Sequence, residues 1–280
     1  MRVVTWNLWW RFGPWAERRE AILAVLRELR PDVVGLQEVW AVDGGENLAE
    51  WLACGLGLHA AWWPSPAPGR WQRRIGDDTV GVGTAVLSRR PVVERAVLRL
   101  PAPAELDDGR LAAYARLDVP GHRVPFFTVH LTSGGRARAV RREQATALAA
   151  FVARHRHGTA HPPVVTGDFN ARPGAPEVRL LRAAGLRDAW EHAEPGAPSG
   201  TWDTANPYVA HADGEPSVRI DYVHVGPPGP GGLGRVLAVR RSGDGPVDGV
   251  WPSDHAAVVV DLADAGTPPA PATGPGTPDW

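Results

Sequence analysis

The sequence has very little cysteine and no lysine at all. Its 280 residues include a single cysteine, Cys54, which excludes an internal disulfide and a cysteine-based zinc site. All 30 basic residues are arginine, which indicates GC-rich codon usage rather than a chemical role. The formal net charge is -1, so no overall positive field draws the chain to nucleic acid, and this weakens the case for a general nuclease.

Long apolar runs are absent too. No stretch approaches the ~18 consecutive apolar residues of a membrane span, and the N-terminal stretch MRVVTWNLWWRFGPW has no apolar core of signal-peptide length. We therefore expect a cytoplasmic protein without a transmembrane segment, and a monomer by default. Because the chain ends in a stretch rich in proline and glycine, we expect residues 264–280 to be a disordered tail and residues 1–263 to form one folded domain.

Short apolar strands separated by turn residues dominate the chain. Residues 3–6 and 32–39 are apolar runs typical of buried strands, and an amphipathic helix predicted between them suggests a βαβ-like opening. From residue 80 onward, short strands alternate with turns, which favours a meander of largely antiparallel strands. Residues 62–78, rich in proline, arginine and tryptophan, are expected to form a surface loop. Helices are expected over residues 17–30, 47–56, 136–157 and 176–184.

Polar side chains recur where the predicted strands end. Each one alone could be a turn or capping residue. A carboxylate buried beside apolar strands, however, costs several kcal/mol unless a cation or hydrogen bonds compensate it. Taken together, the set indicates a metal and proton-transfer centre at one rim of a two-sheet α/β domain. Its members are Asn7, Glu38, His130, Asp168, Asn170, Asp221, Asp254 and His255.

The donor types in this set select the metal. Asn7, Glu38, Asp168, Asn170 and Asp254 all offer oxygen, and the chain has neither a usable thiolate nor an HExxH motif. Hard oxygen ligands without a histidine cluster favour Mg²⁺ or Mn²⁺ over zinc. Because such an ion is usually completed by water and a phosphate oxygen, the set favours phosphoester chemistry over peptide hydrolysis.

Six short motifs occur in an ordered series: TWN, LQEV, TVHL, GDFN, RIDYV and SDH. In this series the chain resembles the endonuclease/exonuclease/phosphatase superfamily over residues 3–262. This deoxyribonuclease I-like group also contains neutral sphingomyelinases and inositol polyphosphate 5-phosphatases. The resemblance implies a catalytic domain over residues 1–263. Its expected fold is a four-layer α/β sandwich, in which two packed, mostly antiparallel sheets are flanked by helices and carry the site at one rim.

The resemblance assigns the metal side of the site to Glu38, with Asn7 and Asp254 beside it. Some members carry an acid two residues after the first asparagine, where this chain has Trp9, so metal binding would depend more heavily on Glu38. The histidine of TVHL is more typical of the deoxyribonuclease, sphingomyelinase and phosphatase branches than of enzymes that cleave abasic DNA. An abasic-site repair function is therefore disfavoured.

The catalytic side is assigned in the same way. His255 corresponds to the active-site histidine of the family, and Asp221 to the acid that orients it. Asp168 matches the residue that positions or deprotonates water, or holds a second metal, while Asn170 and His130 match groups that bind the scissile phosphate. The sequence leaves open whether Asp168 or His255 takes the proton of the attacking water.

Two further positions, Thr201 and Trp9, complete the expected site. Thr201, in GTW, lies where the family often has a small hydroxyl residue, and Trp9 follows a strand end closely enough to line the mouth of the pocket. If strand alternation persists past Asp168, then Asp168 and Asn170 point to one side and Phe169 packs on the other. We then expect Asp168 to contact water and Asn170 to contact the phosphate.

Three functions fit such a site. The favoured one is Mg²⁺- or Mn²⁺-dependent hydrolysis of a phosphomonoester or phosphodiester that is a small molecule or derives from a lipid. A DNA or RNA nuclease is the alternative, because Trp71 is interleaved with Arg70, Arg73 and Arg74 and could stack on bases. A binding protein that kept the fold without activity is the third, and the presence of every motif carboxylate and both histidines argues against it.

Overall fold

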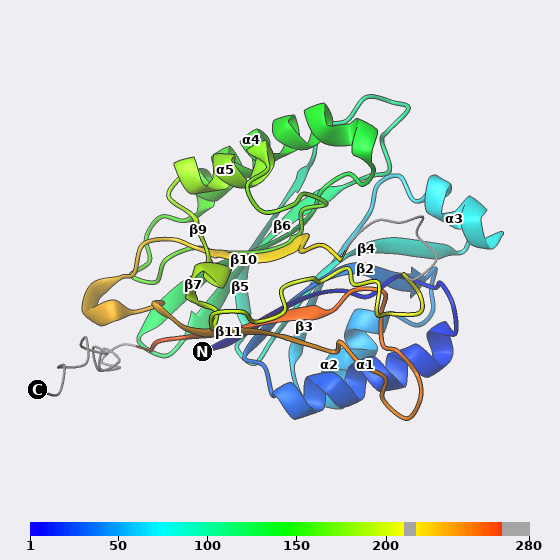
Figure 1. Cartoon of the computed structure of the whole chain (residues 1–280), viewed down its shortest axis with the longest axis horizontal. Coiled ribbons are helices and arrows are strands. Elements are labelled where there is room, and N and C mark those ends of the chain that lie inside the picture. Colours follow the sequence, from blue (N-terminus) through cyan, green and yellow to red (C-terminus); the bar gives the residue numbers. More distant parts are fainter. Residues whose placement is uncertain (210–216, 265–280) are drawn as a thin grey trace, which may run out of the picture.

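Two six-stranded sheets face each other in the computed structural model, which describes residues 1–209 and 217–264 (Figure 1). The first sheet has the order β11 (Val236–Ser242), β12 (Ala257–Leu262), β1 (Arg2–Asn7), β2 (Val33–Val42), β4 (Val80–Ser88), β3 (His59–Pro64). The second has the order β5 (Val92–Arg99), β6 (Leu111–Val119), β7 (His122–His130), β8 (Val164–Asp168), β10 (Asp221–Val225), β9 (Arg187–Asp188). Strands β1 and β2 pair in parallel, as do β7 and β8.

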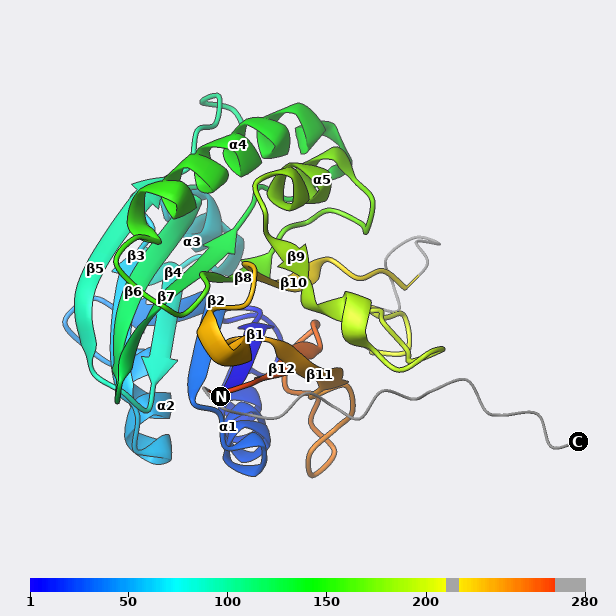
Figure 2. The ribbon, with the colours of Figure 1, turned by 90° about the vertical axis from the view of Figure 1, so that its left-hand side faces the viewer.

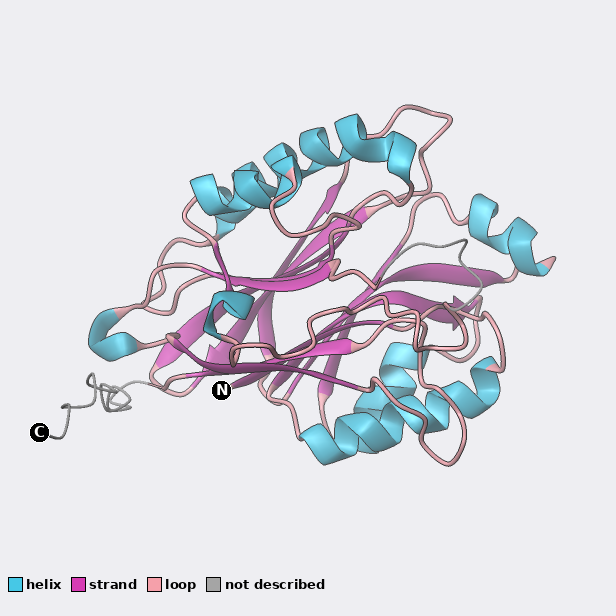
Figure 3. Ribbon diagram, in the orientation of Figure 1, coloured by secondary structure: helices cyan, strands magenta, loops and turns pink. Residues whose placement is uncertain are grey.

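Helices cover both outer faces of this pair of sheets (Figures 2 and 3). Helices α1 (Trp15–Leu29) and α2 (Leu48–Leu56) pack on the first sheet, and α4 (Arg138–His155) and α5 (Pro176–Ala183) pack on the second. The short helix α3 (Gly69–Ile75) lies in a connection, and single 3₁₀ turns occur at Gly135–Ala137, Ala189–His192 and Pro230–Gly232. The predicted four-layer α/β sandwich with mostly antiparallel sheets is confirmed.

Neighbouring residues of the inner strands pack into different cores. In β1, Val3 belongs to the core between the sheets, whereas Val4 packs against α1 and α2. In β8, Val164 likewise faces the inter-sheet core and Val165 faces α4 and α5. A strand buried on both faces needs apolar residues at consecutive positions. This requirement is why these strands appear in the sequence as continuous apolar runs.

A polar layer joins the two sheets close to the ends of several strands. The side-chain amide of Gln37 in β2 donates to Oγ1 of Thr5 at 3.2 Å and to Oγ1 of Thr128 in the opposite sheet at 2.9 Å. The sheets approach so closely here that a Cβ on Gly35 would lie 2.2 Å from Oγ1 of Thr166. Glycine is therefore required at position 35, and the adjoining strand ends are held at a fixed separation.

The segment 62–78 is not the surface loop that its composition predicts. Its first residues belong to β3, and residues 69–75 form α3. Trp71 is buried, with its ring edge-on to Trp10 and stacked beside Phe12. The prediction was wrong because α3 has only two turns and one buried side chain, so it shows no helical periodicity in the sequence.

Two other predictions concern the C-terminal tail and the absence of a transmembrane segment. The predicted tail over residues 264–280 lies outside the described residues, apart from Asp264. Among the described residues, no helix is both long enough and apolar enough to cross a membrane.

His224 in β10 is a buried histidine whose ring nitrogens have no hydrogen-bond partner among the described residues. Its ring stacks on Tyr222, with centroids 5.3 Å apart, and meets Phe169 edge-on at 5.1 Å. Burial lowers the pKa of His224 to about 4. Because a free histidine has a pKa of about 6.5, the unfolded chain takes up a proton between these two values that the folded chain does not.

We therefore predict that His224 makes the protein less stable as the pH falls from about 6.5 to about 4. The loss approaches on the order of 3 kcal/mol at the lower limit. Replacing His224 by Phe should flatten the dependence of the free energy of unfolding on pH in this window, as measured by urea titrations at several pH values. His59→Phe, at an exposed position in β3, should keep the wild-type slope. Equal slopes in the two variants would contradict the prediction.

Candidate active site

The predicted polar residues meet at one edge of the sandwich because of the strand directions. The parallel pairs β1–β2 and β7–β8 bring their carboxyl ends to the same edge, and β10 begins there, since Asp221 pairs with Asp168 across β8 and β10. Polar contacts of 4.0 Å or less link the residues of this cluster, which are Asn7, Glu38, His130, Asp168, Asp221, Asp254 and His255.

Glu38 is directed toward the cluster by an irregularity in β2. The register between β2 and β4 shifts between Leu36 and Val39, and Glu38 itself has a left-handed φ of 51°. Such a bulge changes the direction of a side chain relative to regular strand alternation. The side chain is 12% exposed; burial raises the pKa of Glu38, and the charge of Arg110 opposes that shift.

Asp168 is the most highly connected carboxylate of the cluster. Its Oδ2 accepts a hydrogen bond from Nδ2 of Asn7 at 3.1 Å and lies 3.2 Å from Nε2 of His130. Its Oδ1 accepts from the backbone N–H of Asn170 at 2.8 Å. Burial acts to raise the pKa of Asp168, but His130 and His255 hold it well below its usual range. Asp168 is therefore a fixed negative charge in the site.

His255 is held in place by Asp221. Its Nδ1 lies 2.8 Å from Oδ2 of Asp221, and its Nε2 lies 4.0 Å from oxygens of both Asp168 and Asp254. Burial alone would lower the pKa of His255, but Asp221 and Asp254 raise it well above its ordinary value. Asp254 is 15% exposed, and burial raises its pKa to about 7.

Asp168 and Asn170 both line one cavity of about 590 Å³, together with Glu38, His130 and His255. Continued strand alternation is not the cause, because β8 ends at Asp168 and Asn170 has a left-handed φ of 48°. Phe169 is buried edge-on against Tyr222, as expected. A turn therefore brings the two polar side chains to the same cavity.

Three predicted residues make their contacts with the protein itself. The hydroxyl of Thr201 is fully buried and accepts the backbone N–H of Asp221 at 3.2 Å. Oδ1 of Asn7 accepts the N–H of Trp9 at 2.9 Å, so the amide nitrogen rather than the oxygen faces the carboxylates. Trp9 stacks on Tyr208, with centroids 4.6 Å apart. Neither Thr201 nor Trp9 is among the described residues that line the large cavity.

The sequence patterns do not single out Arg110, which lies in the cluster. It is buried, pairs with Asp108 at 2.8 Å and has its Nη1 within hydrogen-bond distance of the ring of His130. If Arg110 donates to Nδ1 of His130, the proton on Nε2 can be donated to Asp168. Arg110 comes immediately before an apolar strand instead of after one. The available signal was an acid–arginine pair, DDGR, directly before LAAYARL.

A sequence model of the Endonuclease/Exonuclease/phosphatase family matches residues 4–255. The chain belongs to this family. Members of the family hydrolyse phosphoric esters, and this chain is a hydrolase of the same class. A search of curated protein sequences found no match.

Solved structures share the fold over nearly the whole chain. An endonuclease/exonuclease/phosphatase from Beutenbergia cavernae DSM 12333 is 26% identical, with a TM-score of 0.71 over 95% of this chain and 72% of that one. The human Nocturnin catalytic domain with bound sulfate is 22% identical (TM-score 0.70; 94% of each chain). TDP2 from D. rerio, complexed with a single-strand DNA product, is 19% identical (TM-score 0.69; 93% of this chain and 97% of that one).

Enzymes of this family generally depend on a divalent metal, and the donor set fits one. A buried group of Asp168, Asp221 and His255 places potential ligand atoms within 4.8 Å of one another. In addition, Glu38 and Asp168 each raise the pKa of Asp254 by repulsion between like charges. A divalent cation would relieve this repulsion, and oxygen ligands suit Mg²⁺ or Mn²⁺.

Arg18 of α1 links the two loops that carry part of the site. The side chain is 1% exposed and donates to five backbone carbonyls. Four of them belong to the loop after Asn7, and the fifth immediately precedes Ser253 in the loop that carries Asp254. The acceptors are Leu8, Trp9, Trp10, Phe12 and Pro252.

Replacing Arg18 by Leu should lower the free energy of unfolding by at least ~3 kcal/mol, because several buried carbonyls lose their donor. The matched control is Arg19→Leu in the same helix. It removes a partly exposed ion pair with Glu46 and should cost less than ~1 kcal/mol. Urea unfolding followed by tryptophan fluorescence measures both values. A loss in Arg18→Leu no larger than that in Arg19→Leu would show that the link is not needed.

Proposed function

We propose that the protein hydrolyses a phosphoester by attack of water, with Mg²⁺ or Mn²⁺ as cofactor, on a small-molecule or lipid-derived substrate. One observation carries the proposal: the Asp221–His255 pair presents Nε2 4.0 Å from the Asp168 carboxylate, beside a cavity that Glu38 and His130 also line. An orienting acid, a ring nitrogen and a fixed carboxylate are the groups that a water molecule and a phosphoryl group require.

Glu38, Asp254 and Asp168 are the residues that would hold the metal. The potential ligand atoms of Asp168, Asp221 and His255 lie within 4.8 Å of one another, but Asp221 and His255 are already hydrogen-bonded to each other. When bound, a divalent ion supplies neutralising charge to phosphoryl oxygens and lowers the pKa of water. The amide of Asn7 supports this set as a donor to Glu38 and Asp168, and for this chain we prefer that role to direct metal binding.

Asp168 and His255 would act on the water. Asp168 stays ionised, and hydrogen bonds from Asn7 and Asn170 fix the positions of its two oxygens. It can therefore orient a water molecule by accepting a hydrogen bond from it. Asp221 holds the His255 ring through Nδ1, which leaves Nε2 for the water or for a phosphoryl oxygen. The contact of Thr201 with the N–H of Asp221 favours a supporting role for Thr201 behind this pair.

His130, Asn170 and Arg110 would bind the scissile phosphate. All three lie next to Asp168 or Glu38, and Arg110 brings a guanidinium whose planar donors match phosphate oxygens. Donors placed where negative charge develops stabilise the transition state of phosphoryl transfer. Trp9, stacked on Tyr208, is better placed to hold the loop after β1 than to contact a substrate in the large cavity.

Glu38→Ala and His255→Ala should each lower the Mg²⁺-dependent hydrolysis of bis-p-nitrophenyl phosphate by at least ~10²-fold, because each loses a group that acts on the transition state. Excess EDTA should abolish wild-type turnover, and Mg²⁺ or Mn²⁺ should restore it. The exposed His157→Ala variant should behave as the wild type. If both site variants are folded and turn over at the wild-type rate, the assignment of the site is wrong.

A nuclease is the second candidate because of a smaller cavity next to the first. It measures about 120 Å³, shares Glu38 and Ser133 with the large cavity, and is lined by Arg70, Arg74 and Arg110. These arginines could contact phosphates along a strand. Trp71 also lines this cavity, but its ring is buried and packs edge-on against Trp10, so base stacking on Trp71 stays a prediction.

Salt dependence separates these two candidates. Hydrolysis of a small phosphoester should change less than ~3-fold between 50 and 200 mM NaCl, whereas nucleic-acid cleavage through several phosphate contacts should fall by ~10-fold or more. The substrate panel consists of plasmid DNA, RNA, sphingomyelin, inositol phosphates and nucleotides. We expect the protein to hydrolyse a small or lipid-derived substrate fastest, and we expect this activity to depend only weakly on NaCl. Dominant, salt-sensitive cleavage of DNA or RNA would establish the nuclease instead.

A further inference from the structure

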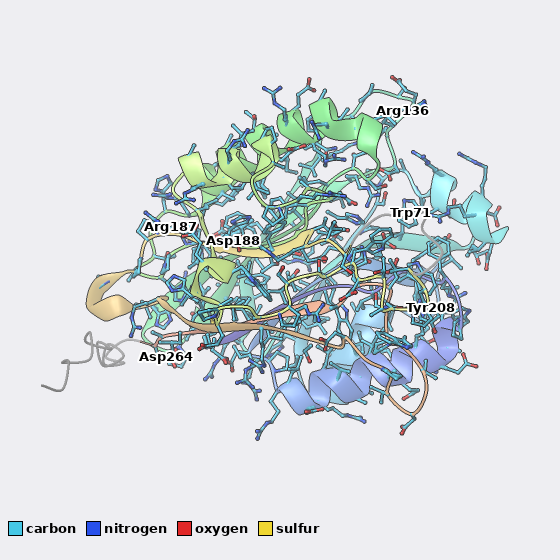
Figure 4. All side chains as sticks on the ribbon, viewed as in Figure 1. Trp71, Arg136, Arg187, Asp188, Tyr208 and Asp264 are labelled. Atoms are coloured by element: carbon cyan, nitrogen blue, oxygen red, sulfur yellow. The ribbon has the colours of Figure 1, made fainter. Side chains whose placement is uncertain are left out.

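The large cavity extends beyond the residues of the proposed chemistry. It continues along residues 133–135, which lead into α4, and is lined there by Arg138 and Arg141. In the view of Figure 4, Arg136 of this connection and Trp71 of α3 lie at the same end of the molecule. Cavities that bind small ligands measure roughly 300–1,000 Å³. At about 590 Å³, this one has room for more than a single phosphoryl group.

Arg141 places a fixed positive charge in the wall of the cavity. The side chain is buried, and its Nη1 donates to the carbonyls of Thr132 at 3.0 Å and Gly134 at 2.8 Å. Its Nε lies 3.4 Å from Oε1 of Glu177 and makes no hydrogen bond within the described part of the chain. The guanidinium is therefore held rigidly while part of its donor capacity stays unused.

Arg138 adds a second positive charge that Glu177 does not balance. It is exposed at the first position of α4, and burial together with the charge of Arg138 lowers the pKa of Arg141. Within the described residues, the first turn of α4 contains no acid and its Ala137 cap offers no side-chain hydrogen bond. Arg138 and Arg141 have Glu177 as the carboxylate beside them, at the positive end of a helix, so this end of the cavity favours an anion.

We propose that this end of the cavity binds a second phosphoryl group of the substrate, next to the scissile phosphoester, and that Arg138 is a specificity-determining contact for it. The proposal rests on the function proposed above, because it uses the same cavity. The backbone there is open: a Cβ on Gly134 or Gly135 would meet no described atom within 4 Å. An oxyanion can therefore approach this connection as well as the two guanidinium groups.

The rest of the lining suits the organic part of such a substrate. Trp202, Val218 and Ile220 supply apolar surface to the same cavity, and each is partly exposed. A bisphosphate whose two phosphoryl groups are joined by a ring or a short carbon chain would place its linker against this surface. This linker chemistry is common to nucleotides and to inositol phosphates, so the experiment has to include both.

The test compares substrates that differ only in the second phosphoryl group. One pair is the thymidine dinucleotide TpT and its 5′-phosphorylated form pTpT, and the other is inositol 1-phosphate and inositol 1,4-bisphosphate. For at least one pair, the wild type should show a kcat/KM at least ~10-fold higher with the second group present, as expected for one charge-assisted contact. Arg138→Gln should reduce this preference to less than ~3-fold. Arg142→Gln, at an exposed α4 position outside the cavity lining, should keep the preference.

Calorimetry with pyrophosphate in EDTA provides a readout that does not depend on turnover. We expect Arg138→Gln to bind this probe at least ~5-fold more weakly than the wild type and Arg142→Gln. Absence of any preference in both substrate pairs, together with equal pyrophosphate binding, would overturn the second-phosphate site. Wild-type turnover of bis-p-nitrophenyl phosphate reports on the proposed function separately, so failure of the hydrolase and failure of this site are distinguishable.

Discussion

The packing of four carboxylates against one another at the edge of an apolar sandwich is the constraint on which the site depends. Glu38, Asp168, Asp221 and Asp254 lie close together where water is largely excluded, and each charge disfavours the others. Their environments differ: two histidines hold the pKa of Asp168 low, whereas burial raises the pKa of the other three. One carboxylate is thus a permanent anion, and the others need a proton, a hydrogen bond or a cation. Such a group is prepared to accept a divalent ion.

The sandwich stabilises this arrangement because pairing within its two sheets holds the strand ends in place. Two parallel strand pairs deliver carboxyl ends to one edge, and the hydrogen bond of Gln37 to Thr128 ties the sheets together just behind them. Arg18 then fastens the loops after β1 and before β12 to helix α1. Repulsion within the cluster is opposed by packing and hydrogen bonding outside it. The site can therefore retain unbalanced charge without unfolding.

The sequence predicted which residues meet, because a doubly buried strand appears as an apolar run and a polar residue at its end is unusual. It did not predict how they are oriented. A hydrogen bond from Trp9 sets the amide of Asn7, pairing with β4 accompanies the bulge at Glu38, and a left-handed backbone makes the turn at Asn170. The hydrophobic pattern records none of these. Arg110 was missed because it lies outside the six recognised motifs, and the helix around Trp71 because two turns carry too little periodicity. Alternation reports burial, whereas orientation depends on individual hydrogen bonds and backbone angles that the pattern does not contain.

The strand ends and the connection into α4 have different parts in the proposed choice of substrate. The proposed catalytic cluster lies at strand ends whose positions the two sheets determine, and solved structures with 19–26% identity share this fold over nearly the whole chain. Residues 133–137, which form the connection into α4, belong to neither sheet. Its positive charge can thus vary without disturbing the carboxylates. Once a cation neutralises the cluster, the arginines at this end dominate the remaining field of the cavity. In the proposed function, the sheets position the groups that act on the phosphoester, and the connection into α4 selects which phosphoester binds.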